Sequence, residues 1–173
     1  VFEKESSLGG TSNFFQGTFG VETRMQKEKH ITYDRDAAFK GIMDFSHWRA
    51  NARLVRTIVN YSADSIYWLQ KLGVEFTDVT NNLPDIPRTY HVVKGEGAAV
   101  IKVLTTRAKE RGVDIRPLTP VKRLIKQGGR ITGVVLEDEE KAVTAGAVVI
   151  ASGGYVNNKQ WMKKYSGMDL GVN

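Results

Sequence analysis

The stretch VFEKESSLGGTSNFF (Val1–Phe15) decides how the rest of the chain is interpreted. Two apolar residues precede an acid, Glu3, and the glycine pair Gly9-Gly10 follows, with the hydroxyl side chains of Thr11 and Ser12 directly after it. In dinucleotide-binding folds, an acid at the carboxyl end of the second strand accepts hydrogen bonds from the adenosine ribose. Adjacent glycines leave backbone N–H groups uncovered, and such a loop suits a pyrophosphate. The stretch therefore predicts the end of a strand followed by a cofactor-binding loop.

The composition is that of one ordinary globular domain. The chain has 173 residues, of which 41% are hydrophobic and 25% charged, a size that suits one core better than two. Cysteine is absent, which excludes disulfides, thiolate metal sites and cysteine nucleophiles. The three histidines never stand four residues apart, so we predict no metal site.

The net charge of +6 has several explanations. Positive residues alternate with acids, as in RMQKEKH (residues 24–30), which favours a solvated surface over nucleic-acid binding. The same balance suits an anionic cofactor or a dicarboxylate substrate. No apolar run reaches the roughly 18 residues of a membrane span. We expect a cytoplasmic location, although a chain that begins at Val1 without Met leaves room for a missing leader.

Apolar periodicity predicts four helical segments. The first begins at Asp36, and the second runs from an Asn51 cap to Gly73, with Leu54, Val55, Ile58, Tyr61, Ile66 and Leu69 as its apolar positions. The third covers Glu96–Arg111, and the last begins at Asn157 or Asn158 and ends near Tyr165.

Strand patterns dominate after residue 112. Residues 113–118, 121–127 and 130–138 alternate with period two, and Gly128-Gly129 predicts a hairpin between the last two segments. The continuous apolar run Ala147–Ala151 is typical of a strand buried on both faces of a parallel sheet. Residues 74–93 indicate a loop with some extended character, because they contain two prolines and two asparagines. The plan is therefore an α/β fold, a parallel sheet with an antiparallel hairpin excursion.

A second dinucleotide signal lies at Gly95-x-Gly97, which follows an extended run and opens a helix, with Asp114 after the next strand. The third glycine of the fingerprint is replaced by Val100, and Lys94 interrupts the strand. A flexible connection into the helix explains the glycines better. An NAD(P)-dependent reductase remains an alternative, as does a scaffold domain without a cofactor.

The chain resembles the FAD-binding flavoprotein subunits of the fumarate reductase and succinate dehydrogenase family, which includes urocanate reductases and ketosteroid dehydrogenases. The resemblance rests on FEKESSLGGTSNFFQG (residues 2–17), on residues 51–79, on residues 104–138 and on AVVIASGGYVNN (residues 147–158). It is weak between Thr80 and Glu96. It implies a Rossmann-like FAD-binding domain, covering residues 1–173 as a single partial domain.

The resemblance also implies roles for particular residues. Glu3 would bind the adenosine ribose, with Lys4 beside it, and Val121 would offer backbone hydrogen bonds to the adenine. The remaining residues would approach the pyrophosphate, the flavin or the rest of the cofactor; they are Gly9, Gly10, Thr11, Ser12, Gly17, Ala151, Ser152 and Gly153. Ser152 stands where the family usually has threonine. The FAD would be non-covalent, because no flavin-linking histidine lies in GGTSNFFQG (residues 9–17).

By the same resemblance, the chain is a fragment that lacks the first strand with its Gly-x-Gly-x-x-Gly loop and the capping domain. The intact enzyme would transfer a hydride between flavin and the carbon–carbon double bond of a carboxylate or enone-type substrate, served by an electron-donor protein or domain. No catalytic residue is assigned in this chain, and we expect the fragment alone to be inactive and to bind FAD weakly or not at all. For His91 we weigh a site role against an ordinary loop histidine.

Overall fold

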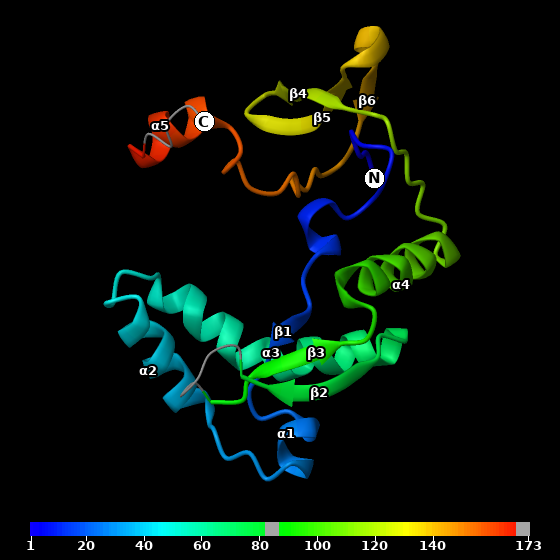
Figure 1. The fold of residues 1–173 in the computed structure, drawn as a ribbon. Coiled ribbons are helices and arrows are strands. Elements are labelled where there is room, and N and C mark those ends of the chain that lie inside the picture. The colour runs from blue at the N-terminus through cyan, green and yellow to red at the C-terminus, as the bar shows by residue number, and fades with distance from the viewer. Residues whose placement is uncertain (82–86, 169–173) are drawn as a thin grey trace. The chain divides into compact units, whose positions relative to one another are not determined.

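The computed structural model describes residues 1–81 and 87–168. Contacts between residues divide the chain into two compact units, which are described separately (Figure 1). Unit 1 contains Val1 and Thr11–Ile115, and unit 2 contains Phe2–Gly10 and the residues from Arg116 onward.

Unit 1 is built on a three-stranded antiparallel sheet. Its strands are β1 (Gly17–Phe19), β2 (Phe76–Thr80) and β3 (Tyr90–Val93), in the order β1-β3-β2. Residues 74–93 were predicted as a loop with some extended character; the structure instead has strands at 76–80 and 90–93, and residues 82–86 lie outside the described residues. β3 is central because it pairs with both β1 and β2, and its alternate residues His91 and Val93 are buried.

Helices accompany this sheet, and most begin at a side-chain cap. They are α1 (Arg24–Glu28), α2 (Arg35–Phe45), α3 (Ala52–Leu72) and α4 (Glu96–Glu110), preceded in the chain by η1 (Gly10–Asn13). α1 contacts β2, α4 contacts β3, and α2 packs on α3. The predicted cap is confirmed at Asn51, whose side chain accepts from the N–H of Leu54 at 3.1 Å. The predicted end at Gly73 is also confirmed, because this residue has a φ of 107° in the left-handed region.

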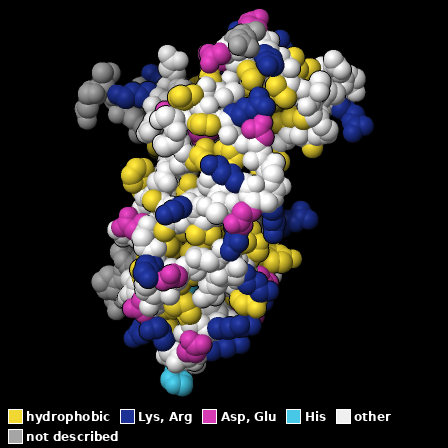
Figure 2. All heavy atoms as spheres, turned by 90° about the vertical axis from the view of Figure 1, so that its right-hand side faces the viewer, with side chains coloured by type: hydrophobic (Ala, Val, Ile, Leu, Met, Phe, Trp, Pro, Cys, Tyr) yellow, Lys and Arg dark blue, Asp and Glu magenta, His cyan; other side chains and the backbone are white. Residues whose placement is uncertain are grey.

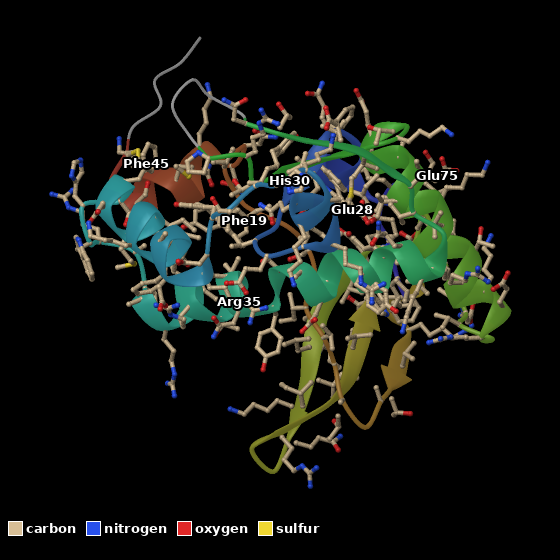
Figure 3. The ribbon with its side chains drawn as sticks, turned by 90° about the horizontal axis from the view of Figure 1, so that it is seen from below. Phe19, Glu28, His30, Arg35, Phe45 and Glu75 are labelled. Atoms are coloured by element: carbon tan, nitrogen blue, oxygen red, sulfur yellow. The ribbon has the colours of Figure 1, made fainter. Side chains whose placement is uncertain are left out.

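Two apolar clusters form the core of unit 1. One joins α2 and α3 through Val21, Ala38, Met43, Val55 and Val59, with Phe19 of β1 packed against it (Figure 3). The other joins α4 to the sheet through Val74, Val93 and Val100. The long helix α3 does not bury all its predicted apolar positions, since Leu54, Ile58 and Tyr61 are exposed. The buried side of α3 instead includes Val59 and Ser62.

A buried polar cluster ties β3 to the segment that follows β1. The ring of His91 is fully buried, and its Nε2 lies 2.8 Å from the hydroxyl of Thr23. Its Nδ1 lies 3.2 Å from the carbonyl of Thr89, which can only accept, so the neutral ring carries its proton on Nδ1. Gln26 completes the cluster, because its Oε1 accepts from the N–H of Thr23 and its Nε2 donates to the carbonyl of Arg88.

Unit 2 contains a second antiparallel sheet. Its strands are β4 (Val121–Gln127), β5 (Arg130–Leu136) and β6 (Ala142–Thr144), with the short η2 (Asp138–Glu140) between the last two. The hairpin predicted at Gly128-Gly129 is confirmed, with φ values of 54° and 80° that glycine adopts without strain. The final helix, α5 (Lys159–Ser166), is also confirmed, and Asn158 caps it.

The predicted parallel sheet is not present among residues 1–81 and 87–168. The single parallel pairing there is an isolated bridge between Phe2 and Arg116. Residues 113–118 form only that bridge, and Ala147–Ala151 form no strand. A strand buried on both faces needs a neighbour on each side, and none of the described residues pairs with this run. Val149 and Ile150 are consequently 89% and 69% exposed.

Charged side chains are dispersed over the surface. On the face in Figure 2, Lys and Arg side chains lie among Asp and Glu side chains and apolar groups, as the alternating sequence predicts. Several ion pairs join side chains at the surface, such as Lys29 with Asp78 at 2.9 Å. In the part of the chain that the structure describes, no helix combines the length and the apolar character that crossing a membrane requires.

The buried ring of His91 makes stability depend on pH. Burial lowers the pKa of His91, so between this lowered value and the ordinary one the unfolded chain binds more protons than the folded chain. The free energy of unfolding is then complete above the ordinary histidine pKa and falls, as pH decreases, by up to about 1.4 kcal/mol per pH unit. Denaturant unfolding at pH 7.5 and 5.5 measures the difference.

In His91→Gln this acid sensitivity should shrink, because the amide does not titrate, while the stability at pH 7.5 falls by about 1–3 kcal/mol through lost buried hydrogen bonds. His30→Gln is the control, since His30 is exposed and should leave the pH dependence unchanged. An unchanged pH dependence in His91→Gln would contradict the explanation.

Candidate cofactor site

The chain start in unit 2 lies along the segment that leads into β4. The N–H of Glu3 donates to the carbonyl of Arg116 at 3.0 Å, and the N–H of Thr119 donates to the carbonyl of Glu3 at 2.8 Å. Leu118 bonds in the same way to Glu5. This pairing holds Glu3 next to Thr119, two residues before Val121. The structure therefore brings the residues predicted for the ribose and for the adenine to one place.

The Glu3 carboxylate is oriented by its own loop. Its Oε1 accepts from the N–H of Glu5 at 2.9 Å, which keeps the half-buried side chain from rotating freely. The second carboxylate oxygen has no partner among the described residues, so it remains an acceptor for a hydroxyl. Lys4 is exposed, and its Nζ lies 3.4 Å from Glu5. An acceptor and a cation thus stand side by side at the chain start.

A hollow of about 570 Å³ joins Lys4 to the other predicted segment of unit 2. It is lined by Gly154, Tyr155, Asn158 and Lys159 among others, which follow directly after Ala151, Ser152 and Gly153. Two lysines, Lys4 and Lys159, are part of this lining, and a pyrophosphate carries the complementary charge. The donor set therefore fits the anionic part of FAD.

Three of the glycines predicted to approach the cofactor have left-handed backbone conformations. Gly9, Gly10 and Gly153 have φ values of 101°, 48° and 76°, in the left-handed region that side chains disfavour. A Cβ at Gly153 would meet nothing within 4 Å, so no side chain crowds the backbone there. Thr11 and Ser12, which follow in η1, are exposed. Left-handed glycines followed by exposed hydroxyl side chains are typical of loops that bind phosphate.

Gly17 in unit 1 has a packing role of its own. It pairs with Val92, and a Cβ there would stand 2.4 Å from the carbonyl oxygen of His91 and 2.7 Å from the ring of Tyr90. Glycine at this position therefore lets β1 approach β3. The predicted position of Gly17 beside the flavin stays a prediction.

Packing around Gly97 accounts for the Gly95-x-Gly97 pattern, and no bound nucleotide is needed to explain it. A Cβ on Gly97 would lie 1.9 Å from the carbonyl oxygen of Ser12 and 2.9 Å from the ring of Phe15. The N–H of Gly97 also donates to the carbonyl of Phe15 at 2.7 Å. The start of α4 is thus packed directly on the loop after η1, and this contact accounts for the glycine.

Two features of unit 1 were not anticipated from the sequence. His91 is neither a site residue nor a loop residue, since it lies in β3 as part of the buried cluster. A second hollow, of about 380 Å³, lies where the end of β2, β3 and the start of α4 meet, and Gln16, Tyr90 and Glu96 are part of its lining. The only local signal was Gly95 before Glu96, which predicts a turn but not a cavity.

Comparison with known proteins shows the family of the chain. The FAD binding domain family matches residues 1–169. A vinyl phenol reductase of Lactiplantibacillus plantarum is 33% identical over 98% of this chain and 35% of its own length. An NADH:fumarate oxidoreductase of Klebsiella pneumoniae is 28% identical over 95% of this chain and 19% of its own.

The fold shows the same relationship. The open conformation of a flavocytochrome c3 fumarate reductase superposes with a TM-score of 0.87 at 26% identity, covering 96% of this chain and 31% of that structure. The chain belongs to the FAD binding domain family. The predicted family and cofactor are therefore confirmed, and the chain spans about a third of the length of the vinyl phenol reductase and of the fumarate reductase structure.

The close contact at Gly97 is testable by stability. Gly97→Ala should lower the free energy of unfolding by about 1–3 kcal/mol, because the new methyl group meets backbone that cannot rotate away. Gly41→Ala is the matched control: it lies inside α2, its Cβ would meet only the hydroxyl of Tyr33, and alanine favours helix by about 1 kcal/mol. Opposite shifts in the two melting temperatures are expected; equal shifts would show that Gly97 tolerates a side chain.

Proposed function

We propose that this chain is part of the cofactor domain of an FAD-dependent oxidoreductase that reduces the carbon–carbon double bond of a small molecule. The observation that carries the proposal is the hydrogen-bonded pairing of residues 2–5 with residues 116–119, which holds Glu3 beside the approach to Val121. When bound, FAD would supply the hydride chemistry, and the protein would supply position and electrostatics.

The proposed roles follow from the geometry of each group. The free oxygen of Glu3 would accept from the ribose hydroxyls, and the backbone at Val121 would bond to the adenine edge. The ammonium of Lys4 and the glycine loop at Gly9 and Gly10 would bind the pyrophosphate, with Thr11 and Ser12 as further donors. Gly17, Ala151, Ser152 and Gly153 would line the remaining cofactor. We also propose that residues 1–173 belong to one cofactor domain.

The reaction class is supported by what the related proteins share. The names of the relatives give a vinyl phenol in one case and fumarate in another as the molecule reduced. Both molecules contain a carbon–carbon double bond next to an activating group. An activated alkene is therefore the proposed substrate class, and reduction the proposed direction. The fragment by itself is proposed to be inactive.

The role of Glu3 is tested by FAD affinity. Glu3→Gln in the whole protein should raise the Kd for FAD roughly tenfold, because the carboxamide keeps the bond to Glu5 but loses the charge that strengthens the ribose hydrogen bonds. Calorimetric titration of the cofactor-free protein, checked by the visible absorbance of bound flavin, measures the change.

Glu28→Gln removes an equivalent charge from an exposed carboxylate of α1 and should leave the FAD affinity unchanged. Equal Kd values for the wild type and Glu3→Gln would argue against the ribose role, and failure of the whole protein to bind any flavin would argue against the proposed function itself.

A further inference from the structure

The second hollow, where the end of β2, β3 and the start of α4 meet in unit 1, is lined by both apolar and polar side chains. It has a volume of about 380 Å³, within the range of small-molecule sites. Its described lining consists of two valines of β3 together with polar groups: Gln16, Thr80, Asn81, Tyr90 and Glu96. Among these described residues, the carboxylate of Glu96 is the one charged side chain.

The hollow adjoins the residue expected beside the flavin. Gln16 directly precedes Gly17, and the ring of Tyr90 occupies the space where a Gly17 side chain would lie. If Gly17 passes the flavin as the proposed function holds, a molecule in this hollow lies next to the cofactor. The inference therefore rests on the proposed function.

Glu96, which lines the hollow, has an unfavourable backbone conformation. Its φ is 57°, in the left-handed region that a residue with a side chain rarely adopts, and it follows Gly95 in the same region. Such strain is kept where the surroundings require it, often at functional positions. Among the described residues, none forms an ion pair with the Glu96 carboxylate, so its charge remains available to a ligand.

The nearest lysine in the sequence does not neutralise this charge. The Nζ of Lys94 lies 2.7 Å from the carboxylate of Glu75, and this hydrogen bond raises the pKa of Lys94 and keeps it charged on its partner. Lys94 is not part of the lining. The described lining of the hollow therefore contains one carboxylate and no cation.

We propose that this hollow receives the hydroxyl-bearing end of a neutral aromatic alkene, with Glu96 accepting the hydrogen bond from the hydroxyl. A hydroxyl donates to a carboxylate in a short, charge-assisted bond, whereas a dicarboxylate would bring like charge to the same wall. The ring of such a substrate would lie against Val92 and Tyr90, and the amide of Gln16 supplies a further polar contact. Glu96 is thus a specificity-determining residue that favours neutral substrates over dicarboxylates.

Binding of reaction products that cannot be reduced further tests the proposal without turnover. The probes are 4-ethylphenol and succinate, titrated by calorimetry into the FAD-loaded whole protein. The wild type should bind 4-ethylphenol more tightly, and Glu96→Gln should weaken that binding about tenfold while it leaves succinate binding equal or stronger. Glu110→Gln is the matched control, since Glu110 lies at the far end of α4 and pairs with Arg107; it should change neither affinity. Melting temperatures confirm that both variants fold.

Activity measurements distinguish a failure of the proposed reaction from a failure of the substrate assignment. The ratio of kcat/KM for 4-vinylphenol to kcat/KM for fumarate should exceed one in the wild type and fall at least tenfold in Glu96→Gln. If the FAD-loaded protein reduces neither probe, the proposed reaction is overturned and the substrate assignment with it. If it reduces fumarate as well as or better than 4-vinylphenol, or if Glu96→Gln leaves the ratio and both affinities unchanged, the substrate assignment alone is overturned.

Discussion

The buried hydrogen bond between the ring of His91 and the hydroxyl of Thr23 connects the central strand of unit 1 to the start of α1. His91 lies in the central strand β3, and Thr23 begins α1 after the chain has left β1. A buried polar ring without partners would destabilise the fold, so Thr23, Thr89 and Gln26 must surround it in one arrangement. That arrangement determines how β1 lies on β3, and with it where Gln16 and Gly17 stand.

Close backbone approach is the second constraint. Gly20 makes room for the His91 ring, because a Cβ there would stand 2.8 Å from it. Gly97 likewise allows α4 to start directly on the loop after η1. These contacts place Glu96 at the rim of a hollow with Tyr90 and Gln16. The close approaches at Gly20 and Gly97 therefore help to position the strand and the helix start that line this hollow.

Local patterns predicted most helices and the hairpin, because their causes are local. The Asn51 cap, the Gly73 end and the turn at Gly128-Gly129 depend on residues within a few positions of one another. The prediction of a parallel sheet was wrong because strand pairing depends on residues that are distant in the sequence. Ala147–Ala151 has the composition of a buried strand, but composition cannot supply neighbours, and none of the described residues pairs with it.

The sequence by itself determined the family and the cofactor, because the chain matches the FAD binding domain family over residues 1–169. It also led to predicted cofactor residues, and the structure brings Glu3 beside the approach to Val121 by backbone hydrogen bonds. Only the tertiary structure decided that His91 is a core residue and that Glu96 lines a hollow. Burial and cavity walls depend on side chains that meet from distant parts of the chain, and no local pattern records which of them will meet.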